Sequence, residues 1–221
     1  MREKVPPYFS IQVARKVQRY LSSKIVMKDL LPPFIETVAG IDLAYSGNLA
    51  VAAAVLLDYQ TLQVLEKKVA VTKVMFPYVP TLLSFRELKA AFLAYKHLSQ
   101  TPDVILVDAH GYSHPFRLGF ASHFGVVVKK PTIGVAKKLL CGEIGPWKNN
   151  WAPIVAEGEV IGAALRTRKG IKPIYISVGN MVTLNTAIKI VLHTTRRYRI
   201  PEPVRQAHME CTRIARLLRS L

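Results

Sequence analysis

Acidic residues are scarce in this chain. Its 221 residues include 14 Asp and Glu against 31 Lys and Arg, so the formal net charge is +17 and the pI is near 10.1. Such an excess of positive charge must lie on the surface, where it attracts polyanions. The basic residues recur along the whole chain, which favours nucleic acid over a membrane as the partner. A basic surface that serves solubility alone is the alternative.

Cysteines and long apolar runs are also few. Cys141 and Cys211 stand far apart without CxxC spacing, so we expect reduced thiols. The longest apolar run, residues 49–57, falls well short of the ~20 residues that span a bilayer. No signal-peptide pattern opens the sequence. We therefore expect a cytoplasmic monomer that does not enter a membrane.

Apolar residues make up 50% of the chain, which is enough for a substantial core. We find no repeat, low-complexity tract or linker, so we expect one domain over residues 1–221. Periodicity and turn residues predict helices at residues 8–27, 84–98, 117–124, 183–198 and from 203 onward. They predict strands at residues 37–46, 49–58, 63–74, 104–107, 126–135, 158–168 and 172–179. Three meandering strands followed by alternating helices and strands predict an α/β fold with a mixed sheet.

Two of the few carboxylates fall where burial is expected. Asp42 lies within the first strand and Asp108 directly follows VILV, and a buried carboxylate is costly unless it is compensated. Acids on neighbouring strands could share a hard divalent ion such as Mg²⁺, and Glu87 on the intervening helix could reach the same point. Such an ion would activate water against a phosphodiester. The alternative is that the two aspartates cap turns and that Glu87 pairs with Arg86 or Lys89.

Three further polar groups stay ambiguous on spacing alone. His110 and His114 have the i, i+4 spacing of a zinc pair, but the glycine and proline beside them disfavour a helix and no HExxH accompanies them. Lys137 follows a glycine turn at a strand end. It is either an ordinary surface lysine or a residue that contacts a phosphate. His208 lies near the start of a helix that a proline-rich segment opens. Its position in the sequence does not by itself predict that it belongs to a functional site.

Several blocks occur in an order that resembles the endonuclease V family: AGIDLAY, FPYVPTLLSFRE, ILVDAHGYSHP, TIGVAKKLL, GEVIGAALRTR, KPIYISVGN and RIPEPVRQAH. The resemblance implies an RNase H-like fold, with a central mixed sheet of the five-stranded type flanked by helices. It also implies a metal-dependent DNA repair endonuclease that acts on deaminated bases. The expected cut lies 3′ to deoxyinosine and leaves a 3′-hydroxyl and a 5′-phosphate.

The resemblance also implies roles for individual residues. Asp42, Glu87 and Asp108 match the ligands of Mg²⁺, for which Mn²⁺ would substitute. Lys137 is expected near the scissile phosphate, and His208 is expected to position water or phosphate. The remaining matches concern nucleic-acid binding: a base-stack wedge formed by Pro77, Tyr78, Val79 and Pro80, and the lesion-pocket glycine Gly111.

The chain departs from the family pattern at Ala109, Phe116 and Asn180, where glycine, arginine and histidine are more familiar. These departures concern pocket shape and strand contacts rather than the three carboxylates. Two other functions stay open. One is an endoribonuclease that cuts RNA at inosine with the same site, and the other is a non-catalytic nucleic-acid-binding protein whose acids are structural.

Overall fold

The computed structural model describes residues 10–220. Its helices are α1 (Ile11–Ser22), α2 (Leu83–Lys96), α3 (Phe120–Val128), α4 (Leu184–His193) and α5 (Glu202–Leu217). Its strands are β1 (Thr37–Ser46), β2 (Leu49–Asp58), β3 (Val64–Lys73), β4 (Val104–Val107), β5 (Thr132–Ala136), β6 (Glu143–Ile144), β7 (Trp151–Ala156), β8 (Glu159–Leu165) and β9 (Ile174–Asn180). Among these residues, no helix has both the length and the apolar character needed to cross a membrane.

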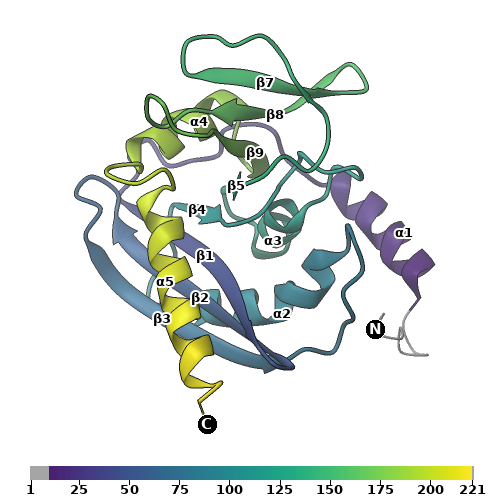
Figure 1. Cartoon of the computed structure of the whole chain (residues 1–221), viewed down its shortest axis with the longest axis vertical. Coiled ribbons are helices and arrows are strands. Elements are labelled where there is room, and N and C mark those ends of the chain that lie inside the picture. The colour runs from purple at the N-terminus through teal and green to yellow at the C-terminus, as the bar shows by residue number, and fades with distance from the viewer. Residues whose placement is uncertain (1–9, 221) are drawn as a thin grey trace.

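All of these strands join one sheet, in the order β3-β2-β1-β4-β5-β9-β8-β7-β6 (Figure 1). The pairs β1/β4 and β4/β5 are parallel, whereas the others are antiparallel. The predicted mixed α/β fold is therefore confirmed. The sheet has nine strands rather than five, because an antiparallel extension, β9-β8-β7-β6, continues from the edge of the first five strands.

Helices cover both faces of the sheet because buried side chains alternate along its strands. On one face, Val51, Val55 and neighbouring residues pack against α4 and α5. On the other face, Ala52, Leu56 and neighbouring residues pack against α2 and α3. Figure 1 shows α5 crossing one face of β1 and β2. The carboxyl ends of the central parallel strands are thus held between two packed layers.

A glycine brings α5 close to the central strand. A Cβ atom built on Gly40 in β1 would lie 1.9 Å from the carbonyl oxygen of Pro203, so any side chain there would displace the helix. Pro203 is in the first turn of α5, where its missing N–H costs nothing. This contact sets α5 across β1 with its following turns beside the end of that strand.

The element boundaries differ from the predicted ones in several places. The first helix, predicted to reach residue 27, ends at Ser22. Residues 126–128, predicted as extended, are helical, and α3 ends where Lys129 adopts a left-handed φ of 53°. The α4 helix ends at His193 rather than near residue 198. The α1 helix begins at Ile11 because the Ser10 hydroxyl accepts a hydrogen bond from the Val13 N–H at 3.3 Å. Residues 8 and 9 of the predicted first helix lie outside the described residues.

Candidate active site

The parallel pairing of β1 with β4 brings two aspartates to one edge of the sheet. Ile41 pairs with Val107, and the Asp108 N–H donates to the Ile41 carbonyl at 2.9 Å. Asp42 and Asp108 are the next residues on the two strands. Burial raises the pKa of Asp108, and the nearby charge of Asp42 raises it further. The predicted proximity of these two acids is therefore seen in the structure.

Asp42 is buried and fully engaged by its neighbours. Its Oδ1 accepts the Leu43 N–H at 2.8 Å, and its Oδ2 lies 2.7 Å from Nδ1 of His208 on α5. This hydrogen bond raises the pKa of His208 despite the opposing effect of partial burial. Cys211, one turn further along α5, places Sγ 3.7 Å from the same carboxylate oxygen.

Asp42, His208 and Cys211 also form a group of possible metal ligands. Each residue offers one ligand atom, and these three atoms lie within 4.8 Å of one another. Between residues 10 and 220, this is the one group of three or more His, Cys, Asp or Glu side chains with that spacing. Sequence reasoning missed Cys211. Its position three residues after His208 places both side chains on one helix face, which was the available signal.

Glu87 approaches from the opposite face of the sheet. It is buried on α2, and its Oε1 accepts a hydrogen bond from the Tyr45 hydroxyl at 2.8 Å. Burial raises the pKa of Glu87 to about 7, and the charges of Asp42 and Asp108 contribute in the same direction. Glu87 is thus within electrostatic reach of both aspartates. Tyr45, three residues after Asp42, was not predicted.

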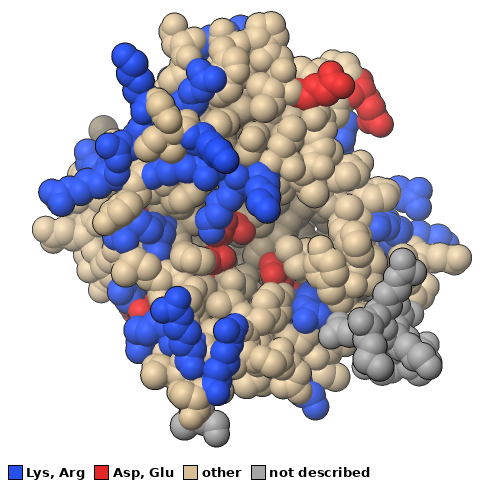
Figure 2. All heavy atoms as spheres, in the orientation of Figure 1, with Lys and Arg blue, Asp and Glu red and all other residues tan. Residues whose placement is uncertain are grey.

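Lys137 supplies the cation closest to Asp108. It directly follows β5, the parallel neighbour of β4, and its ammonium forms an ion pair with the Asp108 carboxylate. The three carboxylates predicted as ligands do not all meet at ligand distance here, since Glu87 and Asp108 lie outside the group of Asp42, His208 and Cys211. Figure 2 shows acidic side chains in a central hollow of the surface, with Lys and Arg side chains around much of its margin.

Comparison with known proteins identifies the family. The family model for endonuclease V matches residues 19–209. A curated endonuclease V from Thermofilum pendens is 48% identical over 96% of this chain and 92% of its own length. This chain belongs to the endonuclease V family. Endonucleases of this family act on nucleic-acid phosphodiester bonds, so the chain is an enzyme of that class.

Solved structures agree with this assignment. The crystal structure of endonuclease V from Bacillus subtilis has a TM-score of 0.90 and 33% identity, covering 97% of this chain and 95% of that one. Endonuclease V from Ciona intestinalis, in complex with a 24mer DNA containing an inosine followed by a ribo-adenosine, has a TM-score of 0.85 and 30% identity. It covers 95% of this chain and all of its own. The expected RNase H-like fold is confirmed by these neighbours.

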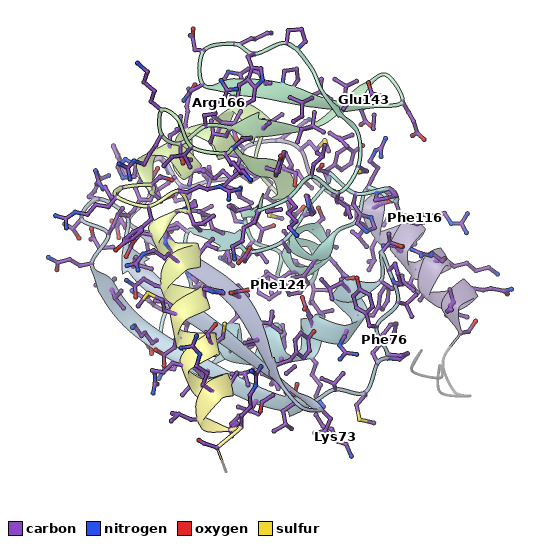
Figure 3. The ribbon with its side chains drawn as sticks, in the orientation of Figure 1. Lys73, Phe76, Phe116, Phe124, Glu143 and Arg166 are labelled. Carbon is purple, nitrogen blue, oxygen red and sulfur yellow. The ribbon has the colours of Figure 1, made fainter. Side chains whose placement is uncertain are left out.

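The segment that resembles the endonuclease V wedge links β3 to α2. Tyr78 is 65% exposed between Pro77 and Pro80. Two residues of α1 anchor the end of this loop, a contact that sequence reasoning did not predict: Arg15 Nη2 donates to the Pro80 carbonyl at 3.2 Å, and Gln18 Nε2 donates to the Thr81 carbonyl at 2.9 Å. Figure 3 shows Phe76, at the start of the loop, on the side of the molecule that carries α1.

Gly111 is buried rather than open to a ligand. A Cβ atom there would lie 2.2 Å from the Val178 carbonyl oxygen of β9, and its N–H donates to Ser177 Oγ at 2.9 Å. Close packing against β9 therefore explains this glycine, and its expected contact with a base stays a prediction. His110 and His114 are largely buried, which lowers the pKa of each to about 4, and neither belongs to the group of possible metal ligands.

Two of the three departures from the family pattern have structural partners. Asn180 is buried, accepts the Val26 N–H at 3.0 Å and donates to the Gly125 carbonyl at 3.1 Å, so it joins β9 to α3. Phe116 lies under the guanidinium of Arg15, 4.2 Å from its ring centroid. Nothing in the structure explains Ala109.

Proposed function

We propose that this chain is a metal-dependent DNA repair endonuclease that nicks the strand 3′ to deoxyinosine. The cut falls at the second phosphodiester on that side and leaves a 3′-hydroxyl and a 5′-phosphate. The observation that carries this proposal is the placement of Asp42 and Asp108 directly after the last parallel pair of β1 and β4, Ile41 and Val107, with Lys137 against Asp108. The inosine-containing DNA bound by the Ciona intestinalis relative supports the choice of lesion.

The donor set fits a hard divalent cation. Asp42, Glu87 and Asp108 offer carboxylate oxygens, which Mg²⁺ prefers and which Mn²⁺ also accepts. Burial and mutual repulsion raise the pKa of Glu87 and of Asp108, so this cluster is costly without a compensating positive charge. We therefore propose these three residues as the ligands, which requires their carboxylate oxygens to come closer together around the ion than they lie in this structure. When bound, the ion supplies an activated water and stabilises charge on the leaving oxygen.

The neighbouring side chains have roles of their own. The Lys137 ammonium lies where it can hold the charge of the scissile phosphate. His208 fixes one ring nitrogen on Asp42, and its side chain is 53% exposed, so the other nitrogen can orient water or a phosphate oxygen. Asp42 thereby fixes the ring of His208 as well as serving as a ligand.

We propose that the lesion is read after extrusion from the duplex. Hypoxanthine presents an N1–H donor where adenine presents an acceptor, so polar groups in a closed pocket can separate the two bases. Tyr78, stiffened by a proline on each side, fills the space left in the base stack. Because β1 to β9 form one sheet, we propose that residues 1–221 act as one endonuclease V-like domain. We also propose that the protein acts in the cytoplasm as a monomer.

One assay tests this function. Purified protein is incubated with an end-labelled duplex that carries one deoxyinosine, and with a matched duplex that carries adenine, in Mg²⁺, Mn²⁺ or EDTA. We expect a single nick, 3′ to the inosine, with either metal and none in EDTA. Binding without cutting under all metals would support a non-catalytic protein. Preferential cutting of a matched inosine-containing RNA would assign the endoribonuclease activity instead, since the sugar is the local difference.

A further inference from the structure

A cationic cavity lies outside the carboxylate site. It has a volume of about 700 Å³ and is lined by residues 149–150 and by residues 166–173, the connection from β8 to β9. We call it the β8–β9 pocket. Four of its lining residues are cationic and none is acidic: Arg166, Arg168, Lys169 and Lys172. Figure 3 shows Arg166 at the end of the molecule that carries β7.

Within residues 10–220, no carboxylate lies within ion-pair distance of these four cations. Four like charges around one cavity repel one another, and no carboxylate among residues 10–220 lies close enough to pair with them and offset that repulsion. Other surface cations of the chain do have carboxylate partners, as Arg117 has in Glu157 and Glu159. The composition of the pocket therefore favours an external anion.

The pocket is also held in shape by hydrogen bonds and stacking. The Arg166 guanidinium lies 3.7 Å from the centroid of the Trp147 ring, which fixes its plane and leaves its N–H edge for a partner. Arg168 donates to the Arg197 carbonyl. Thr167 Oγ1 donates to the Arg199 carbonyl at 2.9 Å. A preorganised set of donors loses less entropy when it binds a phosphate.

One guanidinium joins this pocket to the catalytic end of the sheet. Arg199 Nη2 donates to the Pro173 carbonyl in the pocket wall at 2.7 Å and to the Lys137 carbonyl at 2.9 Å. The backbone that carries the Asp108-bound lysine is therefore tied directly to the pocket wall. A strand that is bound in the pocket is thus held in a set position relative to the carboxylates.

We propose that the β8–β9 pocket binds backbone phosphates of the nucleic acid whose lesion strand occupies the carboxylate site. This inference rests on the proposed function and adds a second phosphate-binding region to it. Contacts of this kind position a substrate without reading its sequence. The pocket should therefore contribute affinity that depends on salt, with no effect on the chemical step.

The test compares two double variants that each remove two positive charges. Lys169→Gln/Lys172→Gln changes exposed lysines of the pocket, and Lys28→Gln/Lys96→Gln changes exposed lysines elsewhere. Binding of a fluorescent inosine duplex is measured in EDTA over a range of salt concentrations. For the pocket variant we expect the slope of log K against log salt to fall by roughly 2 and the affinity to fall roughly tenfold. The control variant should keep the wild-type slope.

Nicking kinetics and folding complete the experiment. For the pocket variant, KM should rise by the factor seen in binding, kcat should stay unchanged, and the thermal midpoint should match that of the wild type. Equal slopes for both variants, or a fall in kcat with KM unchanged, would overturn the pocket assignment. Because binding is measured without metal, a wild-type protein that never nicks inosine would refute the proposed function while the slopes still decide the pocket.

Discussion

The two parts of the sheet carry different polar chemistry. The central parallel strands carry the buried Asp42, the partly buried Asp108 and Lys137, and these side chains contact one another or a neighbouring helix directly. The antiparallel extension, β9-β8-β7-β6, instead carries the β8–β9 pocket, whose cations are exposed and have no acid among them. The carboxylates of the first region are thus largely shielded from solvent, whereas the cations of the second are exposed.

This difference indicates a division of labour. A buried carboxylate must be placed to within a fraction of an ångström to act on a reacting group, and its burial is what perturbs its pKa. An exposed lysine or arginine acts through a screened field over about 8–10 Å and tolerates imprecise placement. Substitutions in the first region should therefore change the rate of nicking, whereas substitutions in the second should change affinity and its salt dependence.

The largest expected effect follows from neutralising either aspartate. Asp42→Asn and Asp108→Asn keep the side-chain shape but remove the charge that a divalent ion requires. We expect nicking of an inosine duplex to fall by roughly 1,000-fold. Single-turnover rates with excess enzyme measure this loss, and binding in EDTA should be retained because each variant makes the site less negative.

Glu143→Gln provides the matched control for these variants. Glu143 is an exposed carboxylate on β6, in the antiparallel extension, and Figure 3 shows it away from the centre of the molecule. Its loss should leave the nicking rate unchanged. Normal cutting by either aspartate variant would remove that residue from the metal site and erase the contrast between the two regions.

The first region was far more predictable from the sequence than the second. Asp42 and Asp108 follow apolar runs of strand length, and adjacent parallel strands place their following residues together. The β7 strand was missed because Pro153 interrupts its apolar pattern, which is typical of edges and irregular segments. The charges of the β8–β9 pocket were visible in the sequence, but their enclosure depends on how two connections fold against each other.

Contacts between distant segments account for the other omissions. The bond from Gln18 to the Thr81 carbonyl spans 63 residues, and that from Arg199 to the Lys137 carbonyl spans 62. No local pattern encodes such pairs, because they depend on the packed positions of whole helices and strands. Cys211 is different, since it lies three residues after His208 on one helix and so shares its face. Tyr45 lies three residues after Asp42 on a strand and therefore points to the opposite face, where its bond to Glu87 spans 42 residues.

A smaller expected effect is a loss of folding stability at low pH. It should come from a buried histidine on α3, a helix that packs against the first region of the sheet. His123 on α3 is buried, its Nδ1 lies 3.0 Å from Ser84 Oγ, and burial lowers its pKa to about 4. Between pH 6.5 and pH 4 the unfolded chain binds a proton that the folded chain does not, so stability falls as pH falls through that window. Between pH 7 and pH 5 this histidine should account for a loss of about 2 kcal/mol.

Urea unfolding at the two pH values measures this contribution. His123→Gln should lose less stability on acidification than the wild type, by about the same 2 kcal/mol. His97→Gln, which removes an exposed histidine at the C-cap of α2, should behave as the wild type does. Residues 143–180, which hold β6 to β9, contain no histidine. A pH dependence in His123→Gln equal to that of the wild type would show that His123 is not a source of the acid sensitivity and would leave His110 and His114, whose pKa values burial also lowers to about 4.

The smallest expected effect concerns the wedge loop, which joins β3 to α2 and so belongs to the first region. Tyr78→Ala removes a ring that is 65% exposed, and Tyr20→Ala removes a ring on α1 that is 63% exposed. If Tyr78 fills the gap in an opened duplex, its loss should slow nicking of inosine duplexes roughly tenfold, because base–aromatic stacking contributes about 1–3 kcal/mol. Single strands have no gap to fill and should be cut at nearly the wild-type rate.

The ratio of kcat/KM on duplex and single strand measures the effect, with Tyr20→Ala as the control. Equal losses on both substrates would assign Tyr78 to general strand binding, and the contrast between rate and affinity would then no longer separate the two parts of the sheet.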